Sequence, residues 1–323
     1  MRLSEVPLNE TVPTGLISFD KAIGGIPRRK FSELYGREGS GKTSLCLRTI
    51  ATSQAVMPDV FEYLYIDTEG AFDKDYAQAI GVTDTNFQVE FENDVTVALD
   101  MLLKRLEAAQ VKGKSLFAVI DSIAGMTTPA EREKGMTGET IGTVPKALTK
   151  FLRLSTIPLL KSGSLVIINN QIRDNVSSMW GGITTPGGHG LKHWASLRVK
   201  MFNSSKKITL SGKDIGYYTT YTIDKKRITS GVFEGFVDNL PIIDGEGFSP
   251  SFDIVNASIK YGIIKQNRAM LYYGDLKWRG IGNLFVDVRD NKDFANELYE
   301  KLVSPKATNN DEEDYNQENE REN

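Results

Sequence analysis

The stretch from residue 36 to residue 43 constrains this chain most, because it fits G-x-x-x-x-G-K-[ST] at every fixed position. The apolar run Phe31–Tyr35 precedes it and has the character of a buried strand, and a helix-forming segment follows it. In such a turn, glycines let backbone N–H groups point inward around phosphates, and the helix N-terminus adds partial positive charge. The sequence therefore predicts a phosphate-binding loop between a strand and a helix. A Gly-rich turn that binds no nucleotide is the alternative.

The loop supplies a candidate binding site for a nucleoside triphosphate and its metal ion. We expect Lys42 to reach the β- and γ-phosphates and the hydroxyl of Thr43 to bind Mg²⁺. The chain has one cysteine and two histidines, so neither a disulfide nor a Cys/His zinc site can form within it. Any metal must then be held by oxygen ligands. The candidate nucleotide contacts are Gly36, Arg37, Glu38, Gly39, Ser40, Gly41, Lys42, Thr43 and Ser44.

Further along the chain, short apolar runs alternate with amphipathic segments. Buried strands are predicted at Tyr63–Asp67, Leu116–Asp121 and Leu165–Asn169. Helices are predicted at Val95–Gln110 and Val144–Lys161, and Pro158 is expected to kink the second helix or end it early. This alternation predicts an α/β fold, with βαβ crossovers and a mainly parallel, twisted sheet flanked by helices.

The second half of the chain has a different pattern. Three β-rich segments follow one another without long helices and predict an antiparallel extension of the sheet: Ser196–Met201, Lys207–Leu210 and Tyr217–Ile223. From about Ser249 a smaller α/β unit is expected. It contains helix-like Ile254–Tyr261, a Gly-containing strand region around Tyr272–Gly282, and a helix near Asp293–Leu302.

Acidic residues follow two of the predicted buried strands. Asp121 ends one strand and suits the role of holding the hydration shell of Mg²⁺, although an Asp that caps the next turn is the competing interpretation. Asp67 and Glu69 follow another strand at the same edge of the sheet, where ligands of open α/β sheets bind. Glu69 is the candidate for orienting and deprotonating an attacking water. Spacing alone does not separate Glu69 from Asp67.

Several stretches narrow this nucleotide-binding class. Thr14–Asp20 with Gly24–Pro27 is similar to the lead-in to the phosphate loop of the RecA family, and Asp67–Asp73 is similar to the segment that carries its catalytic glutamate. From Val12 to about Leu302 the chain resembles this family, and especially its phage-encoded, UvsX-type members. The resemblance implies a RecA-type P-loop NTPase core, ATP and Mg²⁺ as cofactors, and Glu69 as the catalytic glutamate. It also implies that Asp73 and Tyr76 contact adenine.

The strongest part of the resemblance is Ile168–Arg173, which is similar to the strand leading into the family's second DNA-binding loop. It implies that Gln171 senses the γ-phosphate and passes its presence to the loop Asp174–Gly190. In that glycine-rich loop, Met179 and Trp180 could stack on bases. A surface loop with an incidental Trp is the alternative. The candidate DNA-binding residues are Arg173, Met179, Trp180, Gly181, Gly182 and Lys192.

Two further segments correspond to functional parts of the family. Glu131–Thr143 occupies the place of the first DNA loop, where the match is weak and Lys134, Lys146 and Lys150 are only candidate phosphate contacts. By register, Lys225 and Arg227 fall on two basic residues that reach the ATP of a neighbouring subunit; a solvated hairpin turn would also explain these charges. Cellular members carry an N-terminal helix and strand that dock on the next protomer, whereas only residues 1–12 precede the matched segment here.

The charge of the chain is distributed unevenly. The formal net charge is −3, but residues 309–323 carry seven acidic side chains and one Arg, so residues 1–308 have a charge of +3. The acidic end is predicted to be disordered, either for solvation alone or as a competitor for a DNA-binding surface. The expected division is an N-terminal arm (1–12), the ATPase core with its DNA loops (13–248), a small C-terminal domain (249–303) and the acidic tail (304–323). The chain has no signal peptide or membrane-spanning run, which predicts a cytoplasmic protein that binds no membrane.

The function that these features imply is ATP-dependent homologous recombination. The chain would be a DNA-dependent ATPase that forms a helical homo-oligomeric filament on single-stranded DNA and pairs it with homologous duplex DNA in a bacterial cell. Single-strand-binding and loader proteins are conceivable partners. A RecA-like regulatory or loader paralogue and a ring-forming DNA translocase are the alternatives, and no lid or acceptor-pocket signature favours a small-molecule kinase.

Overall fold

The computed structural model describes residues 10–134, 143–174, 183–186, 188–227 and 235–304. A nine-stranded sheet has the order β13-β12-β11-β10-β3-β7-β6-β4-β5. The strands from β10 to β5 pair in parallel, whereas β10 to β13 pair antiparallel. The predicted mainly parallel sheet and its antiparallel extension are therefore both present. The strands are β3 (Phe31–Gly36), β4 (Phe61–Asp67), β5 (Phe87–Phe91), β6 (Ser115–Asp121), β7 (Leu165–Gln171), β10 (Ala195–Leu210), β11 (Lys213–Lys226), β12 (Val237–Ile243) and β13 (Gly247–Phe248).

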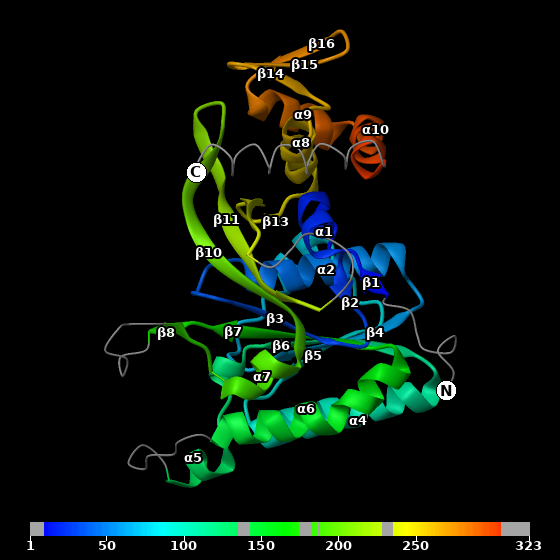
Figure 1. The fold of residues 1–323 in the computed structure, drawn as a ribbon, viewed down its shortest axis with the longest axis vertical. Coiled ribbons are helices and arrows are strands. Elements are labelled where there is room, and N and C mark those ends of the chain that lie inside the picture. The colour runs from blue at the N-terminus through cyan, green and yellow to red at the C-terminus, as the bar shows by residue number, and fades with distance from the viewer. Residues whose placement is uncertain (1–9, 135–142, 175–182, 187, 228–234, 305–323) are drawn as a thin grey trace, which may run out of the picture.

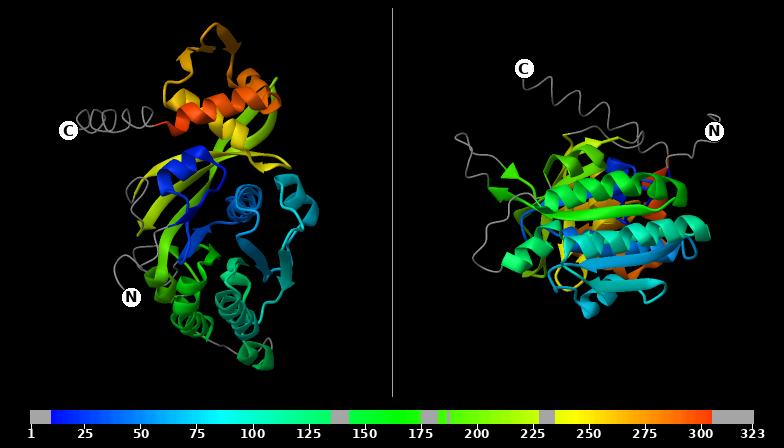
Figure 2. Two further views of the ribbon diagram at one scale, coloured as in Figure 1. Left: turned by 90° about the vertical axis from the view of Figure 1, so that its right-hand side faces the viewer. Right: turned by 90° about the horizontal axis from the view of Figure 1, so that it is seen from below.

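Helices cover both faces of this sheet. On one face lie α4 (Val95–Lys112) and α6 (Thr143–Ser162), which run side by side in Figure 1 and in the right-hand view of Figure 2, seen from below. On the other face lie α1 (Ile17–Ile23), α2 (Lys42–Val56) and α3 (Lys74–Ile80). The prediction that Pro158 ends α6 early is wrong. Pro158 lies inside α6, which continues to Ser162 although the proline has no N–H for the carbonyl of Leu154.

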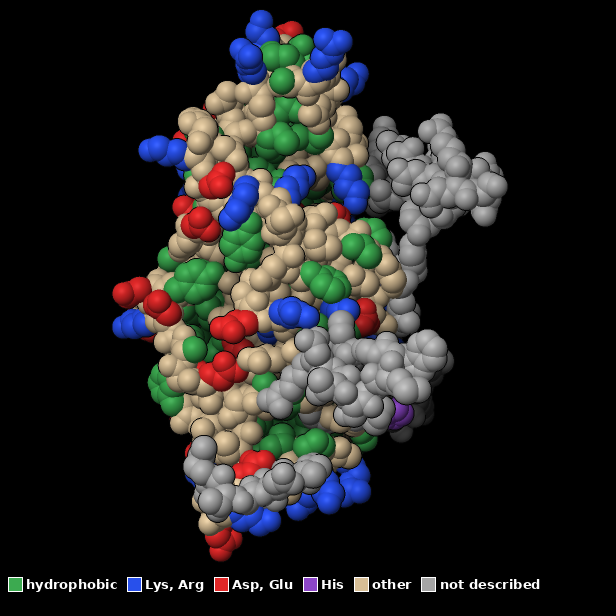
Figure 3. All heavy atoms as spheres, turned by 90° about the vertical axis from the view of Figure 1, so that its left-hand side faces the viewer, with side chains coloured by type: hydrophobic (Ala, Val, Ile, Leu, Met, Phe, Trp, Pro, Cys, Tyr) green, Lys and Arg blue, Asp and Glu red, His purple; other side chains and the backbone are tan. Residues whose placement is uncertain are grey.

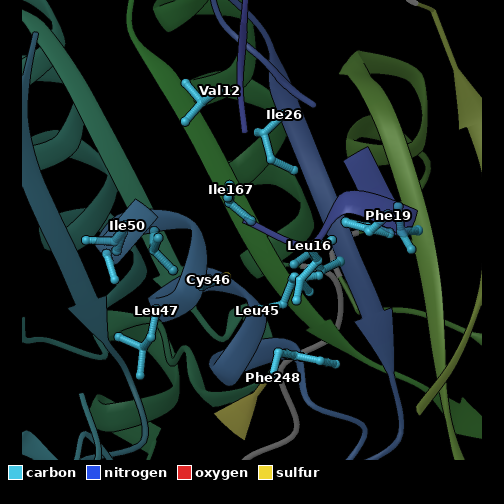
Figure 4. Close-up of a cluster of buried hydrophobic side chains, with 14 of the residues drawn as sticks. Val12, Leu16, Phe19, Ile26, Leu45, Cys46, Leu47, Ile50, Ile167 and Phe248 are labelled. Carbon is cyan, nitrogen blue, oxygen red and sulfur yellow. The ribbon is translucent and has the colours of Figure 1, made fainter. Parts of the chain in front are cut away.

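Each face of the sheet has its own hydrophobic core. Figure 4 shows part of the first core, a cluster that contains Leu45, Leu47 and Ile50 of α2, Ile167 of β7, and Leu16 and Phe19 of the lead-in segment. The second core joins α4 and α6 to the opposite face and includes Leu102 and Phe151. Burial of the sheet on both faces explains why its central strands are nearly continuous apolar runs. It also fixes the carboxyl ends of these strands at one edge.

The C-terminal unit lies at one end of the long axis, beyond the sheet (Figure 1). The predicted helices near 254–261 and 293–302 are confirmed, but the strand region predicted up to Gly282 ends at Arg279 and gives way to α9. Ile208 of β10 and Tyr218 of β11 pack into the core of this unit, so the long β10–β11 hairpin joins it to the sheet. The unit consists of α8 (Pro250–Lys260), β14 (Lys265–Asn267), β15 (Met270–Tyr273), β16 (Leu276–Arg279), α9 (Ile281–Asp290) and α10 (Lys292–Val303).

Shorter elements complete the described chain. β1 (Thr11–Val12) pairs with β2 (Ile26–Pro27), and β8 (Arg173–Asp174) pairs with β9 (Ile183–Thr184). The 3₁₀ turn η2 follows β6. No helix within the described ranges is both long and apolar enough to cross a membrane. The remaining helical elements are η2 (Ile123–Gly125), α5 (Pro129–Lys134) and α7 (Gly188–Trp194).

Candidate nucleotide-binding site

The loop between β3 and α2 closes tightly because its glycines face neighbouring atoms. A Cβ on Gly36 would lie 2.2 Å from the carbonyl oxygen of Met201, and Gly41 has a left-handed φ of 88°. A Cβ on Gly41 would also lie 2.9 Å from side-chain atoms of Ile242 and Phe248. Glycine is therefore the only residue that fits these two positions without strain. The loop presents the N-terminus of the 15-residue helix α2 to the pocket beside it.

Lys42 begins α2 and is buried among loop carbonyls. Its Nζ donates hydrogen bonds to the carbonyl oxygens of Gly36 at 3.2 Å and Arg37 at 2.9 Å. Burial lowers the pKa of Lys42, and the nearby carboxylates of Asp121 and Glu69 oppose that shift. A phosphate at this loop would replace weak carbonyl acceptors with a full negative charge, which suits a partly desolvated ammonium group.

Thr43 and Asp121 bring two oxygen donors together at the pocket. The hydroxyl of Thr43 donates to Oδ2 of Asp121 at 2.6 Å, and the buried Tyr65 hydroxyl donates to the same oxygen at 2.5 Å. Hydroxyl and carboxylate oxygens are the ligands that Mg²⁺ prefers, and Mg²⁺ keeps several waters and substrate oxygens as its other ligands. The described residues contain no cluster of three His, Cys, Asp or Glu side chains, so a tight all-protein cage is absent there. This pair fits a Mg²⁺ ion that arrives with a nucleotide.

The structure gives Glu69 and Asp67 different environments, although their spacing in the sequence does not distinguish them. Asp67 is buried, and both of its carboxylate oxygens accept backbone N–H groups, from Glu69, Gly70 and Phe72 at 2.8–2.9 Å. Its bonds therefore fix the turn after β4. Glu69 is exposed and lines the pocket. Of the two carboxylates, only Glu69 can reach a water molecule in the pocket.

Three neighbouring strands bring polar groups together beside Glu69. Oε1 of Glu69 accepts a hydrogen bond from the Ser122 hydroxyl at 2.6 Å and from Nε2 of Gln171 at 3.2 Å. These residues follow or end β4, β6 and β7, which are adjacent in the sheet. The carboxyl ends of parallel strands meet at one edge, so the topology assembles this cluster. Sequence reasoning did not identify Ser122, which directly follows the predicted Asp121.

The pocket runs from this cluster along the loop and has a volume of about 190 Å³. At its other end, the hydroxyl of Ser44 lies 2.6 Å from the hydroxyl of Tyr76. Asp73 is exposed and caps α3 by accepting the N–H of Tyr76 at 3.0 Å. Tyr217 was not anticipated from the sequence, although it lines the pocket. The described lining is Glu38, Gly39, Ser40, Gly41, Lys42, Thr43, Ser44, Glu69, Asp121, Ser122, Gln171 and Tyr217.

Gln171 also lies shortly before the predicted DNA loop in the chain. The preceding residue, Asn170, is fully buried and its Nδ2 donates to Oε1 of Glu33 at 2.9 Å and to the carbonyl of Pro186 at 2.8 Å. Glu33 has no exposed surface and pairs with Arg198 at 2.5 Å. The Asn170 side chain therefore links the strand before the predicted DNA loop to Pro186 near the end of that loop, through buried hydrogen bonds that also include Glu33.

The candidate DNA-binding residues fall partly outside the described chain. Met179, Trp180, Gly181 and Gly182 lie outside the described residues. Arg173 lies in β8, at the start of the same loop. Lys192 lies half-buried on α7, which follows the loop. Of the first-loop candidates, Lys134 ends α5, and the exposed Lys146 and Lys150 lie on α6.

Neither Lys225 nor Arg227 is among the residues that line the pocket of its own chain. Nζ of Lys225 donates to the carbonyls of Lys192 at 2.6 Å and His193 at 2.9 Å, at the end of α7. Arg227 follows β11 and is exposed.

Comparisons with known proteins agree with this architecture. The model of the RecA N-terminal domain matches residues 1–249. The RecA protein of Porphyromonas gingivalis is 32% identical over 296 residues, which cover 90% of this chain and 84% of that protein. The RecA protein of Thermus thermophilus is 33% identical over 311 residues, covering 94% and 88%. The RecA protein of Frankia casuarinae is 32% identical over 305 residues, covering 92% and 84%.

The matched region includes the phosphate loop, the Glu69 turn and the strand that ends at Gln171. The predicted fold class, a RecA-type α/β core with an antiparallel extension and a small C-terminal α/β part, is confirmed. The chain therefore belongs to the RecA family of DNA-dependent ATPases.

Proposed function

We propose that this protein is a strand-exchange recombinase that uses ATP to control its grip on single-stranded DNA and pairs that DNA with a homologous duplex. The observation that carries the proposal is the hydrogen bond from Nε2 of Gln171 to Oε1 of Glu69, at 3.2 Å. Glu69 faces the pocket, and Gln171 ends the strand that leads into the loop beginning with β8. A nucleotide that competes for either partner changes the hydrogen bonds at the loop entrance, which couples the two sites.

The residues of the pocket divide the chemistry of ATP hydrolysis among them. Lys42 and the N–H groups of the loop bind the phosphates, and Thr43 with Asp121 would hold Mg²⁺, which neutralises charge on the phosphates when bound. Glu69 orients the attacking water and accepts its proton. The water oxygen bonds to the γ-phosphorus as its proton passes to the Glu69 carboxylate; the bond between the γ-phosphorus and the β–γ bridging oxygen breaks, and ADP leaves with that electron pair, giving ADP and inorganic phosphate. Asp73 and Tyr76 hold the adenine end.

Cations from a second copy complete the site. We place Lys225 and Arg227 at the ATP of the neighbouring protomer, where they stabilise negative charge that develops on the γ-phosphate. Comparable arginine fingers raise turnover by about 10³–10⁵. Turnover then depends on assembly of a helical filament. On the basis of the resemblance, we further propose a phage-encoded protein that acts in the cytoplasm of a bacterial cell, with single-strand-binding and loader proteins as partners.

DNA contacts come from the loop and from basic surfaces. Arg173 and Lys192 flank the loop and suit phosphate groups, and Met179 with Trp180 are proposed to stack on bases. Figure 3 shows basic side chains gathered over the C-terminal unit, at the top of that view. The exposed cations on its small sheet are Lys265, Arg268, Lys277 and Arg279.

The proposal is tested by measuring ATP turnover with and without single-stranded DNA over a salt series. Binding driven by phosphate contacts releases counterions, so we expect strong stimulation by DNA that declines steeply as salt rises. The same samples are then assayed for pairing of a labelled strand with homologous and heterologous duplexes. Turnover that ignores DNA at every salt concentration would contradict the recombinase function and favour a regulatory paralogue.

A further inference from the structure

Tyr217 is an aromatic residue at the nucleotide pocket that no motif of the sequence identifies. It lies in the middle of β11, opposite Ile242 of β12. Successive residues of a strand point to opposite faces, and the next residue, Tyr218, packs into the C-terminal core with its ring 6.2 Å from that of Phe252. The ring of Tyr217 therefore points the other way. It packs beside the first core and lines the pocket with the phosphate loop.

Residues from four elements surround this end of the pocket. Tyr76 of α3 approaches Ser44 of α2, with their hydroxyls 2.6 Å apart. The turn between β12 and β13 closes over the same place, because a Cβ on Gly247 would lie 3.0 Å from the Tyr76 hydroxyl. Arg48 of α2 donates to the carbonyl of Glu246 in that turn at 3.4 Å. Tyr217 of β11 and Ser44 line the pocket, and Tyr76 lies beside Ser44 and close enough to Tyr217 to influence its hydroxyl, so the two phenol groups lie near one another at this place.

The direction of a bound triphosphate follows from the residues at the opposite end. Glu69 and Gln171 lie where the γ-phosphate is attacked, and Lys42 lies at the β- and γ-phosphates. The chain of phosphates must then leave past Thr43 and Ser44, which begin α2. The sugar and the base arrive at the end where Tyr76 and Tyr217 stand.

Resting on the proposed nucleotide-binding function, we infer that Tyr217 is a base-contacting residue, which together with Tyr76 forms an aromatic binding surface for the nucleobase of ATP. An aromatic ring offers a large rigid surface on which a base stacks. Burial raises the pKa of the Tyr217 hydroxyl, and Tyr76 and Asp244 raise it further. The phenol is thus neutral at physiological pH and does not repel the phosphates.

A purely structural role for Tyr217 makes a different prediction, since the ring also touches the first core. If replacing Tyr217 disturbed the structure of the phosphate loop, the binding of every ligand at that loop would become weaker. A lost base contact would weaken only ligands that carry a base. Inorganic tripolyphosphate provides the phosphates and the charge of ATP without the base, so it separates the two roles.

The experiment measures binding of ATP and of tripolyphosphate, each with Mg²⁺, to the full chain and to Tyr217→Ala and Tyr217→Phe. Stacking on one aromatic ring corresponds to about a tenfold or greater change in affinity. We expect Tyr217→Ala to bind ATP about tenfold or more weakly while binding tripolyphosphate like the wild type. Tyr217→Phe, which keeps the ring, should bind both ligands like the wild type. Tyr272→Ala is the matched control, because Tyr272 is an exposed tyrosine on β15, outside the pocket.

Three results would overturn the inference. The first is unchanged ATP binding in Tyr217→Ala. The second is an equal loss of ATP and tripolyphosphate binding in that variant, which would assign Tyr217 a structural role. The third is failure of the wild type to bind either ligand, which would overturn the proposed nucleotide site itself and with it this inference. The first two results leave the proposed site intact, so the two failures are distinguishable.

Discussion

At the scale of single residues, Glu69 and Asp67 show how two nearby carboxylates acquire different tasks. Both oxygens of Asp67 accept backbone N–H groups, whereas Oε1 of Glu69 accepts hydrogen bonds from Ser122 and Gln171, whose side chains line the pocket. Carboxylate oxygens that accept backbone N–H groups hold the turn in place and are not directed at a water molecule in the pocket. Asp67 is therefore a structural carboxylate, and we assign the reactive role to Glu69.

This assignment gives a prediction for Glu69→Gln. The amide keeps the size of the side chain but cannot accept a proton from water, so turnover should fall by about 10²-fold or more while ATP and DNA binding persist. Lys42→Ala should instead abolish nucleotide binding, because the phosphates lose their main cation. Binding is followed with a fluorescent ATP analogue and turnover by phosphate release. Glu107→Gln, on the exposed face of α4, is the control and should retain normal turnover. Normal turnover by Glu69→Gln would remove Glu69 from its role.

Asp253 is a second carboxyl group with an unusual environment, inside the contact between α1 and α8. It is fully buried and accepts the backbone N–H of Ser18 at 3.0 Å, as well as the hydroxyl of Ser18. Burial raises its pKa from 3.8 to about 7, although the bonds from Ser18 oppose this shift. Ile17, Ala257 and Leu302 pack as a small apolar cluster that also joins these helices.

The raised pKa of Asp253 makes stability depend on pH. Between pH 4 and 7 the folded chain holds a proton at Asp253 that the unfolded chain has lost, so the folded state binds more protons. The free energy of unfolding should therefore fall as pH rises through this window, by about 1.4 kcal/mol per pH unit at most for one group. Asp253→Asn cannot ionise, so its stability relative to the wild type should be higher at pH 8 than at pH 5 in urea unfolding.

The control for this measurement is Asp290→Asn. Asp290 is exposed, and its pKa is lowered by the hydrogen bond from Arg289. It is ionised in both the folded and the unfolded state above pH 5, so its substitution should shift stability equally at both pH values. If Asp253→Asn also shifts stability equally at pH 5 and pH 8, Asp253 does not hold the proton.

At the scale of elements, α6 continues through Pro158, where the sequence predicts a kink or an early end. Its apolar face places Leu148, Phe151, Leu152 and Leu159 in the second core on both sides of the proline. Proline removes one helical hydrogen bond, but burying this continuous face against α4 outweighs that loss. The local propensity of one residue is thus overridden by tertiary packing.

Replacing this proline should stabilise the protein. Proline in a helix interior is about 3 kcal/mol less favourable than alanine. Proline also restricts the unfolded chain, and losing that restriction lowers the gain in stability by about 0.4–1 kcal/mol. We expect Pro158→Ala to raise the free energy of unfolding by about 2–2.6 kcal/mol, measured in urea. Pro58→Ala is the control, because Pro58 is exposed in a turn after α2 and should give no gain. A less stable Pro158→Ala would show that the proline ring is needed for packing.

Other elements show which features could be predicted from the sequence and which could not. The phosphate loop and the strand ending at Gln171 were predictable because each is one contiguous motif with a local geometry. Helix α9 was missed because Phe285, Val286 and Val288 favour strands; it is helical because Phe285 and Val288 pack into the C-terminal core, with the Phe285 ring 4.9 Å from that of Phe252. Tyr217 was missed because only the pairing of β11 with β12 brings it to the pocket.

At the scale of the whole molecule, the β10–β11 hairpin connects the sheet to the C-terminal unit. Its strands take part in the first core through Val199 and Ile223 and in the C-terminal core through Ile208 and Tyr218. The same strand β11 carries Tyr217 toward the pocket and ends near Lys225. A displacement of this hairpin would therefore move residues at the nucleotide pocket, at the end of α7 and in the C-terminal unit.

In the proposed function, the active unit is larger than one chain. Arg227 lies exposed beyond β11 and does not line the pocket of its own chain, whereas Glu69 does. If ATP is hydrolysed at the junction of two protomers, each junction takes Glu69 from one copy and Arg227 from the next. A variant lacking either residue then has no complete junction.

Mixing two inactive variants should consequently restore activity. We expect Glu69→Gln and Arg227→Ala each to lose nearly all DNA-stimulated turnover. In a one-to-one mixture assembled at random on single-stranded DNA, about one quarter of the junctions pair an intact Glu69 with an intact Arg227. Turnover should therefore recover toward about one quarter of the wild-type rate, rising with total protein concentration as junctions form. A mixture that stays inactive would show that both residues serve the ATP of their own chain, because no exchange between neighbours could then complete the site.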